Sequence, residues 1–200
     1  MKKIIVASKS SDRTELFNRL NIPFKVLITN VNESEHKERI FDPIELVKEL
    51  AKAKVLKAKE MLGNNEKGTV VIAADTIVEL DGEIIGKAQN ETEAFKMLKN
   101  LANSSHNLIT GIAISEIGDV KVVLDYDITV VTILDLSDDD IWNYIRIGEW
   151  KGRAGAYSSR DRASLFIKEI QGSPSNVIGL PMQKVFAILK TEFNLNLLKS

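Results

Sequence analysis

Cysteine is absent from this chain of 200 residues, and histidine occurs only twice. Without cysteine the chain has no disulfide, no thiol nucleophile and no thiolate metal ligand, and two histidines argue against a His-rich zinc site. Any catalytic metal should therefore be held by carboxylates, whose hard oxygen atoms suit Mg²⁺ or Mn²⁺.

Long apolar runs and an excess of one charge are also missing. No run approaches the ~20 apolar residues of a membrane span, and the apolar start Met1 to Ala7 is too short for a signal-peptide core. Lys and Arg number 27 against 28 Asp and Glu, with no basic half that would bind nucleic acid. We therefore expect a cytoplasmic protein with no membrane and no nucleic-acid partner.

Proline and glycine are few, four and eleven, and they are scattered singly. The chain has no linker, repeat or low-complexity segment, so we expect one domain over residues 1–200. The expected strands are Ile4–Ala7, Phe24–Thr29, Thr69–Ala74, Ile77–Leu80, Glu83–Ile85, His106–Glu116, Val120–Leu134 and Leu165–Ile170. The expected helices follow Ser8–Asp12, Asp42, Asn90, Ser137 and Pro181.

Helices and strands alternate along the chain, which is typical of an α/β fold. Asp81-Gly82 and Gly118-Asp119 each join two strand-like stretches, and Asp-Gly favours the type I′ turn of a hairpin. Hairpins are antiparallel, so the predicted sheet is mixed and not purely parallel.

The segment Ser8 to Arg13 combines small hydroxyl residues with cations at a helix start. Ser8 and Ser10 let a ligand approach backbone N–H groups, and Lys9 and Arg13 add positive charge, which is the pattern of an anion site. An ordinary serine-capped helix has the same pattern and is the commoner case.

Two carboxylates are candidates for chemistry. Asp75 follows an apolar strand that we expect to end at Asp75-Thr76, where α/β sheets usually open their ligand crevices. A turn aspartate bonded to nearby backbone is an equal alternative. Glu33 lies in the polar stretch Asn32–Arg39, which is either part of a metal site or a solvated loop.

Lys54 and Lys87 complete the set of candidate charges. Each is more often a solvated surface group than a ligand, and Gly82 to Lys87 is one residue short of a phosphate-binding Walker loop. Two carboxylates, several cations and a Ser-rich turn are together suited to a metal-bound polyphosphate.

The order of several segments resembles the Maf family, named for inhibition of septum formation. The matching segments are Ala7-Ser8-Lys9-Ser10 with Arg13 and Glu15, Glu33, Leu50-Ala51 with Lys54, Ala74-Asp75-Thr76, Gly86-Lys87, Leu101 to His106, Thr110-Gly111, Thr129, Tyr144, Gly148-Glu149, Ala154-Gly155-Ala156-Tyr157 and Asn176-Val177-Ile178-Gly179-Leu180-Pro181. The resemblance covers essentially the whole chain.

The resemblance implies a nucleoside triphosphate pyrophosphatase that cleaves between the α and β phosphates with a divalent metal. It also implies an elongated mixed sheet flanked by helices, in two lobes around a cleft, as a homodimer. Asp75 would then accept a proton from water and share the metal with Glu33, whereas Lys54, Lys87 and Arg13 would neutralise the triphosphate.

Three residues depart from the family's pattern. Asp12 stands where an arginine is typical, Arg160 where a glutamine is typical, and Ala73 where a glycine is typical. In the branch that prefers thymidine and uridine triphosphates the positions of Asp12 and Arg160, with Thr76, help to select the base, so the base preference is open. The alternative function is a non-catalytic nucleotide-binding or nucleic-acid-binding regulator of cell division.

Overall fold

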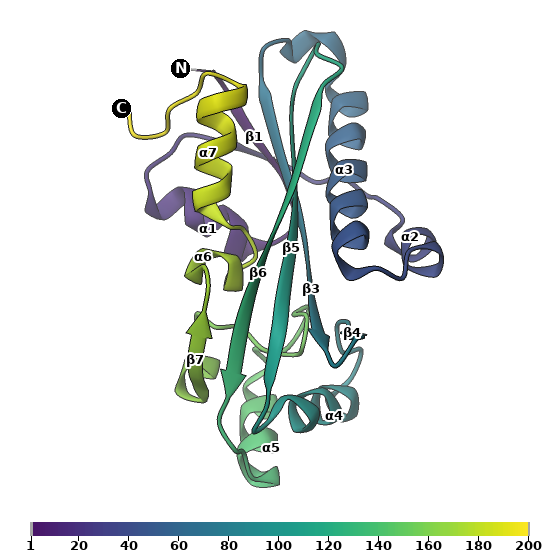
Figure 1. The fold of residues 1–200 in the computed structure, drawn as a ribbon, viewed down its shortest axis with the longest axis vertical. Helices are drawn as coiled ribbons and strands as arrows, with labels where there is room; N and C mark the ends of the chain where they lie inside the picture. The colour runs from purple at the N-terminus through teal and green to yellow at the C-terminus, as the bar shows by residue number, and fades with distance from the viewer. Residues whose placement is uncertain (1, 200) are drawn as a thin grey trace. The chain divides into compact units, whose positions relative to one another are not determined.

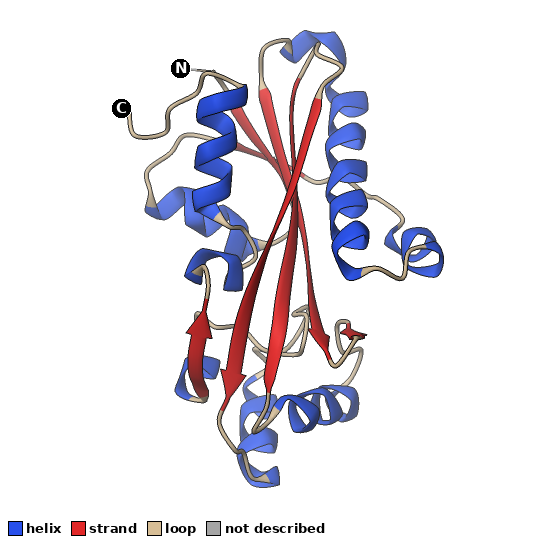
Figure 2. Cartoon of the chain, in the orientation of Figure 1, coloured by secondary structure: helices blue, strands red, loops and turns tan. Residues whose placement is uncertain are grey.

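The computed structural model describes residues 2–199 as a mixed α/β fold (Figures 1 and 2). The elements in chain order are β1 (Ile4–Ala7), α1 (Ser11–Arg19), β2 (Lys25–Leu27), α2 (Glu33–Arg39), α3 (Pro43–Leu62), the 3₁₀ helix η1 (Gly63–Glu66), β3 (Val70–Leu80), β4 (Glu83–Ile85), α4 (Glu91–Leu101), β5 (Ser105–Glu116), β6 (Val122–Ile133), α5 (Asp138–Ile147), the 3₁₀ helix η2 (Arg162–Leu165), β7 (Ile167–Gln171), α6 (Pro174–Val177) and α7 (Met182–Glu192). Within residues 2–199, no helix is both long enough and apolar enough to cross a membrane.

Within residues 2–199 the strands form one sheet of seven strands in the order β2-β1-β3-β5-β6-β7, with β4 paired to β3. Strand β1 is parallel to both β2 and β3, whereas β4 is antiparallel to β3 and β7 is antiparallel to β6. The sheet is therefore mixed, which confirms the fold class predicted from the interleaved helices and hairpins.

The chain packs as two compact units that share the long strands β3, β5 and β6. The first unit holds the residues up to Asp75, Thr110–Asp127 and the residues from Gly179 onward, and the second holds Thr76–Ile109 and Ile128–Ile178. Each unit is described below by itself.

In the first unit, helix α3 covers one face of the sheet (Figure 1). Its buried residues Ala51, Val55 and Ala58 pack against every second residue of β1, β3 and β5, including Val71 and Ala73. Because side chains alternate across a strand, Ile4, Val6 and Ile72 on the other face are buried as well, where α1 and α7 lie in Figure 1.

Small residues on β5 let α3 approach closely. Gly111, Ala113 and Ser115 occupy alternate positions of β5, and all are buried. A Cβ added at Gly111 would lie 2.3 Å from the carbonyl carbon of Val47 and 2.6 Å from the backbone nitrogen of Lys48. Only glycine fits where the helix backbone rests directly on the strand.

The second unit has its own core, to which α4, α5 and the strand residues of Thr76–Ile109 and Ile128–Ile178 contribute. Tyr144 and Phe166 pack edge to face with ring centroids 5.1 Å apart. The Nε2 atom of His106 is hydrogen-bonded to the buried Tyr157 hydroxyl at 2.8 Å, and burial lowers the pKa of His106 to about 4. His106 is thus a neutral core residue.

The start and stop signals of several elements are confirmed. Ser10, Asp42, Asn90 and Ser137 are N-caps whose side chains accept a backbone N–H of the following turn. The Asp81-Gly82 turn has φ angles of 52° and 87°, as a type I′ hairpin requires.

Three local predictions are wrong. Strand β3 does not end at Asp75 but continues to Leu80, because buried apolar residues resume at Ile77 and the carboxylate has a partner. The stretch from Glu33 is helix α2 and not a loop, with ion pairs four residues apart on its surface. The predicted strand Leu165–Ile170 begins at Ile167. Leu165 belongs to η2 instead, where Ala163 and, three residues later at the end of η2, Phe166 are buried.

Candidate functional site

The turn between β1 and α1 is held by two serine hydroxyls. Ser8 is buried at the end of β1, and its Oγ accepts a hydrogen bond from the backbone N–H of Ser10 at 3.1 Å. Ser10 caps α1 by accepting the N–H of Arg13 at 3.5 Å. The predicted serine-capped helix start is confirmed, and Lys9 in this turn is exposed.

Contacts of its guanidinium group hold Arg13 in place. Its Nε donates to the carbonyl oxygen of Gly179 at 2.6 Å, and its Nη1 donates to Ser8 Oγ at 3.3 Å. Gly179 has a φ of 105°, a backbone conformation open to glycine. Burial lowers the pKa of Arg13, and the charges of Asp75 and Glu33 act in the opposite direction.

Asp75, Lys54 and Glu33 form one cluster in the first unit. Lys54 Nζ lies 2.5 Å from Asp75 Oδ1 and 3.0 Å from Glu33 Oε1. The side chains of Lys54 and Asp75 are 12% and 11% exposed, and that of Glu33 is 32% exposed. The structure therefore brings together three of the predicted site residues, which come from α3, β3 and α2.

The alternation of β3 explains why Asp75 meets Lys54. Asp75 continues the row of Val71 and Ala73, which face α3, so its carboxylate points to the same side. Lys54 is next to Val55, which packs on that face of the sheet. A turn aspartate bonded to local backbone, the alternative interpretation of Asp75, does not describe this geometry.

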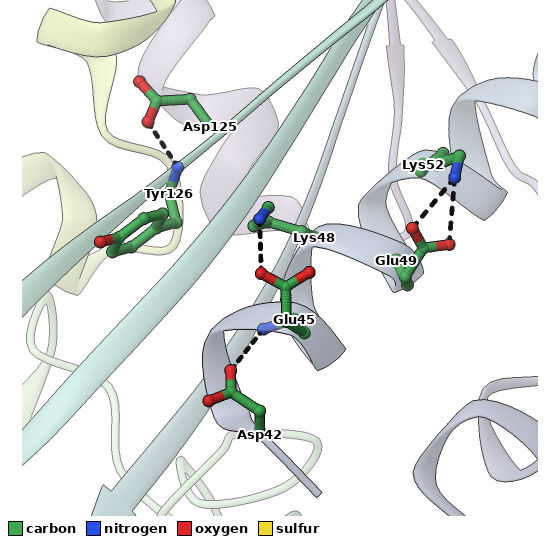
Figure 3. Close-up of polar contacts among 7 residues, drawn as sticks. All are labelled: Asp42, Glu45, Lys48, Glu49, Lys52, Asp125 and Tyr126. Atoms are coloured by element: carbon green, nitrogen blue, oxygen red, sulfur yellow. Dashed lines mark hydrogen bonds and ion pairs between the residues drawn. The ribbon is translucent and has the colours of Figure 1, made fainter. Parts of the chain in front are cut away.

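Lys54 differs from its neighbours on α3. Lys48 and Lys52 pair with glutamates of the same helix, at 2.7 Å to Glu45 and 3.0 Å to Glu49 (Figure 3). Those pairs are local contacts three residues apart on a solvated helix surface. Lys54 pairs instead with carboxylates from two other elements, so it is part of a built site.

The charges of this cluster and of Arg13 balance. Asp75 and Glu33 supply two negative charges, Lys54 supplies one positive charge, and Arg13, on which both carboxylate charges act, supplies the other. In a partly buried site such pairing offsets the cost of removing each charge from water. The same four groups are suited to a polyanion with a cation, because they offer cations to phosphates and oxygen ligands to a metal.

A divalent metal fits the donor set of Asp75 and Glu33. Mg²⁺ is commonly bound by one or two carboxylates together with substrate phosphates and water, without a full protein cage. Among residues 2–199, no group of three or more His, Cys, Asp or Glu side chains is arranged to hold a metal. The pair therefore suits a metal that is also bound by a phosphate-bearing ligand.

The other predicted site residues are divided between the two units. Asp12 is buried in the first turn of α1, where the dipole of the helix stabilises a negative charge. Thr76 points to the face of β3 opposite Asp75. Lys87 is exposed, and its backbone forms an isolated antiparallel β-bridge with Ala154 in the second unit. The half-buried Arg160 belongs to the same unit.

Two glycines of the site were not identified from the sequence as functional. Gly179 presents its carbonyl to Arg13, and Gly111 sets how closely the helix with Lys54 approaches the sheet. A glycine inside an apolar strand run is a signal of close backbone approach, and it was available at Gly111.

Comparison with known proteins gives a consistent result. A family model described as Maf-like protein matches residues 3–192. A dTTP/UTP pyrophosphatase of Caldanaerobacter subterraneus subsp. tengcongensis is 45% identical over 96% of this chain and 89% of its own length. A dTTP/UTP pyrophosphatase of Thermoanaerobacter sp. is 40% identical over 98% of this chain and its entire length.

Among solved structures, a nucleoside-triphosphatase / dITP/XTP pyrophosphatase from Mycobacterium abscessus covers 66% of this chain and 72% of its own. Its TM-score is 0.34 at 12% identity. The family match over residues 3–192 and the two relatives at 40% identity or more show that this chain belongs to the family of Maf-like proteins.

Proposed function

We propose that this protein is a nucleoside triphosphate pyrophosphatase that hydrolyses the α-β phosphoanhydride to a nucleoside monophosphate and pyrophosphate. The observation that carries the proposal is the cluster of Asp75, Lys54 and Glu33, together with Arg13, on which both carboxylate charges act. It is supported by family membership and by relatives named dTTP/UTP pyrophosphatase. From those names we take dTTP and UTP as the substrates to test first.

Asp75 is the proton acceptor in this mechanism. A water oxygen forms a bond to the α-phosphorus as the bond from that phosphorus to the bridging oxygen breaks, and pyrophosphate leaves. The carboxylate of Asp75 takes the proton of the water, a task for which a positioned base contributes about 10²- to 10⁴-fold in rate. Asp75 is buried, so this base is held away from bulk water.

Lys54 and Arg13 neutralise the phosphates. The ammonium of Lys54 can move from the carboxylates to a phosphate oxygen because its stem is flexible. The guanidinium of Arg13 is fixed by Gly179 and Ser8, and this fixed positive charge stabilises the charge that develops on the leaving group.

Asp75 and Glu33 would hold a magnesium or manganese ion, which supplies positive charge to the phosphate oxygens. Roles for Lys9, Lys87, Thr76 and Arg160 toward the substrate stay predictions from the family resemblance. Homodimer formation and a cytoplasmic location are likewise predictions, and light scattering of the purified protein tests the first.

The test is a panel of nucleoside triphosphates with Mg²⁺ or Mn²⁺, in which pyrophosphate and orthophosphate are assayed separately. We expect pyrophosphate release, which the isosteric variant Asp75→Asn lowers by about 10²- to 10⁴-fold. Asp139→Asn, at an exposed position of α5, is the matched control. Near wild-type turnover in a folded Asp75→Asn protein would contradict the mechanism, and binding without turnover would favour a regulator.

A further inference from the structure

The ammonium of Lys54 occupies the position between the two carboxylates that suit a metal. It lies 2.5 Å from Asp75 Oδ1 and 3.0 Å from Glu33 Oε1. A divalent cation that used the same oxygen atoms would lie about 2.0 to 2.6 Å from each of them. The ammonium and the ion therefore need the same space.

The charge of the cluster leads to the same conclusion. With Lys54 and Arg13 charged, the two carboxylates are already neutralised, so a divalent ion entering alone would leave two excess positive charges. Like charges in a partly buried site repel more strongly than in water, because the local dielectric is lower. The side chain of Lys54 is 12% exposed, so solvent screens this repulsion only weakly.

A triphosphate removes both obstacles. Its negative charge compensates the added ion, and its oxygen atoms offer the ammonium a new partner within reach of a flexible stem. Asp75 and Glu33 are then available to the metal. Glu33 Oε2 lies 3.6 Å from Lys37 Nζ. This ion pair is exposed and therefore contributes little binding energy compared with the less exposed pairs of Lys54.

We propose that Lys54 is an internal cation that excludes free divalent metal from the Asp75–Glu33 pair, so that the metal enters only together with the triphosphate. The proposal rests on the proposed function, since it assumes a metal-bound nucleotide as the substrate. It assigns Lys54 a second role beyond phosphate binding, which is to set the order of binding.

Binding of Mn²⁺ without nucleotide tests the proposal. Electron paramagnetic resonance reports the free Mn²⁺ in mixtures with the wild-type chain and with Lys54→Met, whose unbranched side chain is one atom shorter than lysine and carries no charge. We expect Lys54→Met to bind Mn²⁺ at least tenfold more tightly than the wild type. Ligand binding to the folded state raises the unfolding temperature, so Mn²⁺ should stabilise this variant and leave the wild type unchanged.

Two further variants locate the effect. Lys52→Met removes a lysine of the same helix that pairs with Glu49, and we expect it to bind Mn²⁺ as the wild type does. In the double variant Lys54→Met/Asp75→Asn the gain should disappear, because one of the two carboxylates is neutral. If Lys54→Met does not fold, Lys54→Gln, whose neutral side chain has the same reach and is polar, is measured in the same way.

The result that overturns the proposal is equal Mn²⁺ affinity of the wild type and the folded Lys54 variant. A gain that persists when Asp75 is replaced would overturn it too. Failure of the proposed function has a different outcome, because it would appear as absent pyrophosphate release from every triphosphate whatever the Mn²⁺ binding. The two failures are therefore separable.

Discussion

Replacing Gly111 by alanine changes the contact on which the position of α3 depends. The added Cβ would lie 2.3 Å from the carbonyl carbon and oxygen of Val47 and 2.6 Å from the backbone nitrogen of Lys48. These are helix backbone atoms, so no side-chain rotation relieves the overlap. Removing the side chain of Val47 would not relieve it either.

The size of the effect follows from the distances. To restore an ordinary contact of 3.4 Å, the helix must move away from β5 by about 1 Å. Overpacking a core costs about 1 to 3 kcal/mol, occasionally more, and a rigid backbone neighbour favours the upper end. At about 2 to 4 °C per kcal/mol for a chain of this size, the unfolding temperature should fall by about 6 to 12 °C.

The same displacement should reach the site. Lys54 lies about two helical turns after Val47, and its ammonium contacts Asp75 at 2.5 Å. A misplacement of about 1 Å can lower turnover by about 10²-fold. We therefore expect Gly111→Ala to lose both stability and, at temperatures where it is folded, pyrophosphate release.

The measurements are thermal unfolding followed by circular dichroism and steady-state kinetics at low temperature. Gly86→Ala is the stability control, because its added Cβ would meet no atom within 4 Å. If Gly111→Ala unfolds at the same temperature as Gly86→Ala, the close approach of α3 does not restrict this position. If the unfolding temperature falls and turnover is unchanged, the position of α3 does not set that of Lys54.

Three further predictions concern buried polar groups and the base. Above pH 6.5 His106 is neutral in both the folded and the unfolded chain, whereas between pH 6.5 and about 4 only the unfolded chain gains the proton. The free energy of unfolding should therefore fall by about 3 kcal/mol as the pH is lowered through this window. Urea unfolding at several pH values should show a smaller fall for His106→Gln. Asn176 is 0% exposed and donates to the Leu108 carbonyl at 3.2 Å and to the Thr129 hydroxyl at 3.0 Å. Asn176→Ala should therefore lower the free energy of unfolding in the same assay by about 1 to 3 kcal/mol for each group left unpaired. An unchanged urea midpoint would contradict this prediction. Asp12→Arg with Arg160→Gln should raise the preference for dTTP and UTP by roughly tenfold in kcat/KM, and an unchanged substrate profile would argue against a selector role.

Local signals in the sequence predicted most of the elements and the starts of several helices. The caps at Ser10, Asp42, Asn90 and Ser137 depend on atoms within three residues of each other, and such contacts form whatever the rest of the chain does. Helix α2 was missed although its pairs at four-residue spacing are also local. The pairs Glu33–Lys37 and Glu35–Arg39 are local signals of a helix.

The candidate site was predicted as a set of residue types and not as a geometry. Glu33, Lys54, Asp75 and Arg13 were identified from the family resemblance and from the chemistry of their side chains. Their pairing could not be derived from the sequence. Helix α3 has several lysines, and which of them reaches Asp75 depends on how closely the helix packs on the sheet.

The sequence by itself determined the mixed α/β class, the hairpin turns and the charge balance of the chain. The tertiary structure decided that β3 runs through Asp75, that α3 rests on Gly111 and that one ammonium bridges two carboxylates. The physical reason is range: caps and turns are fixed by neighbours along the chain, whereas a buried charge adopts its position only when packing brings its partners from distant segments.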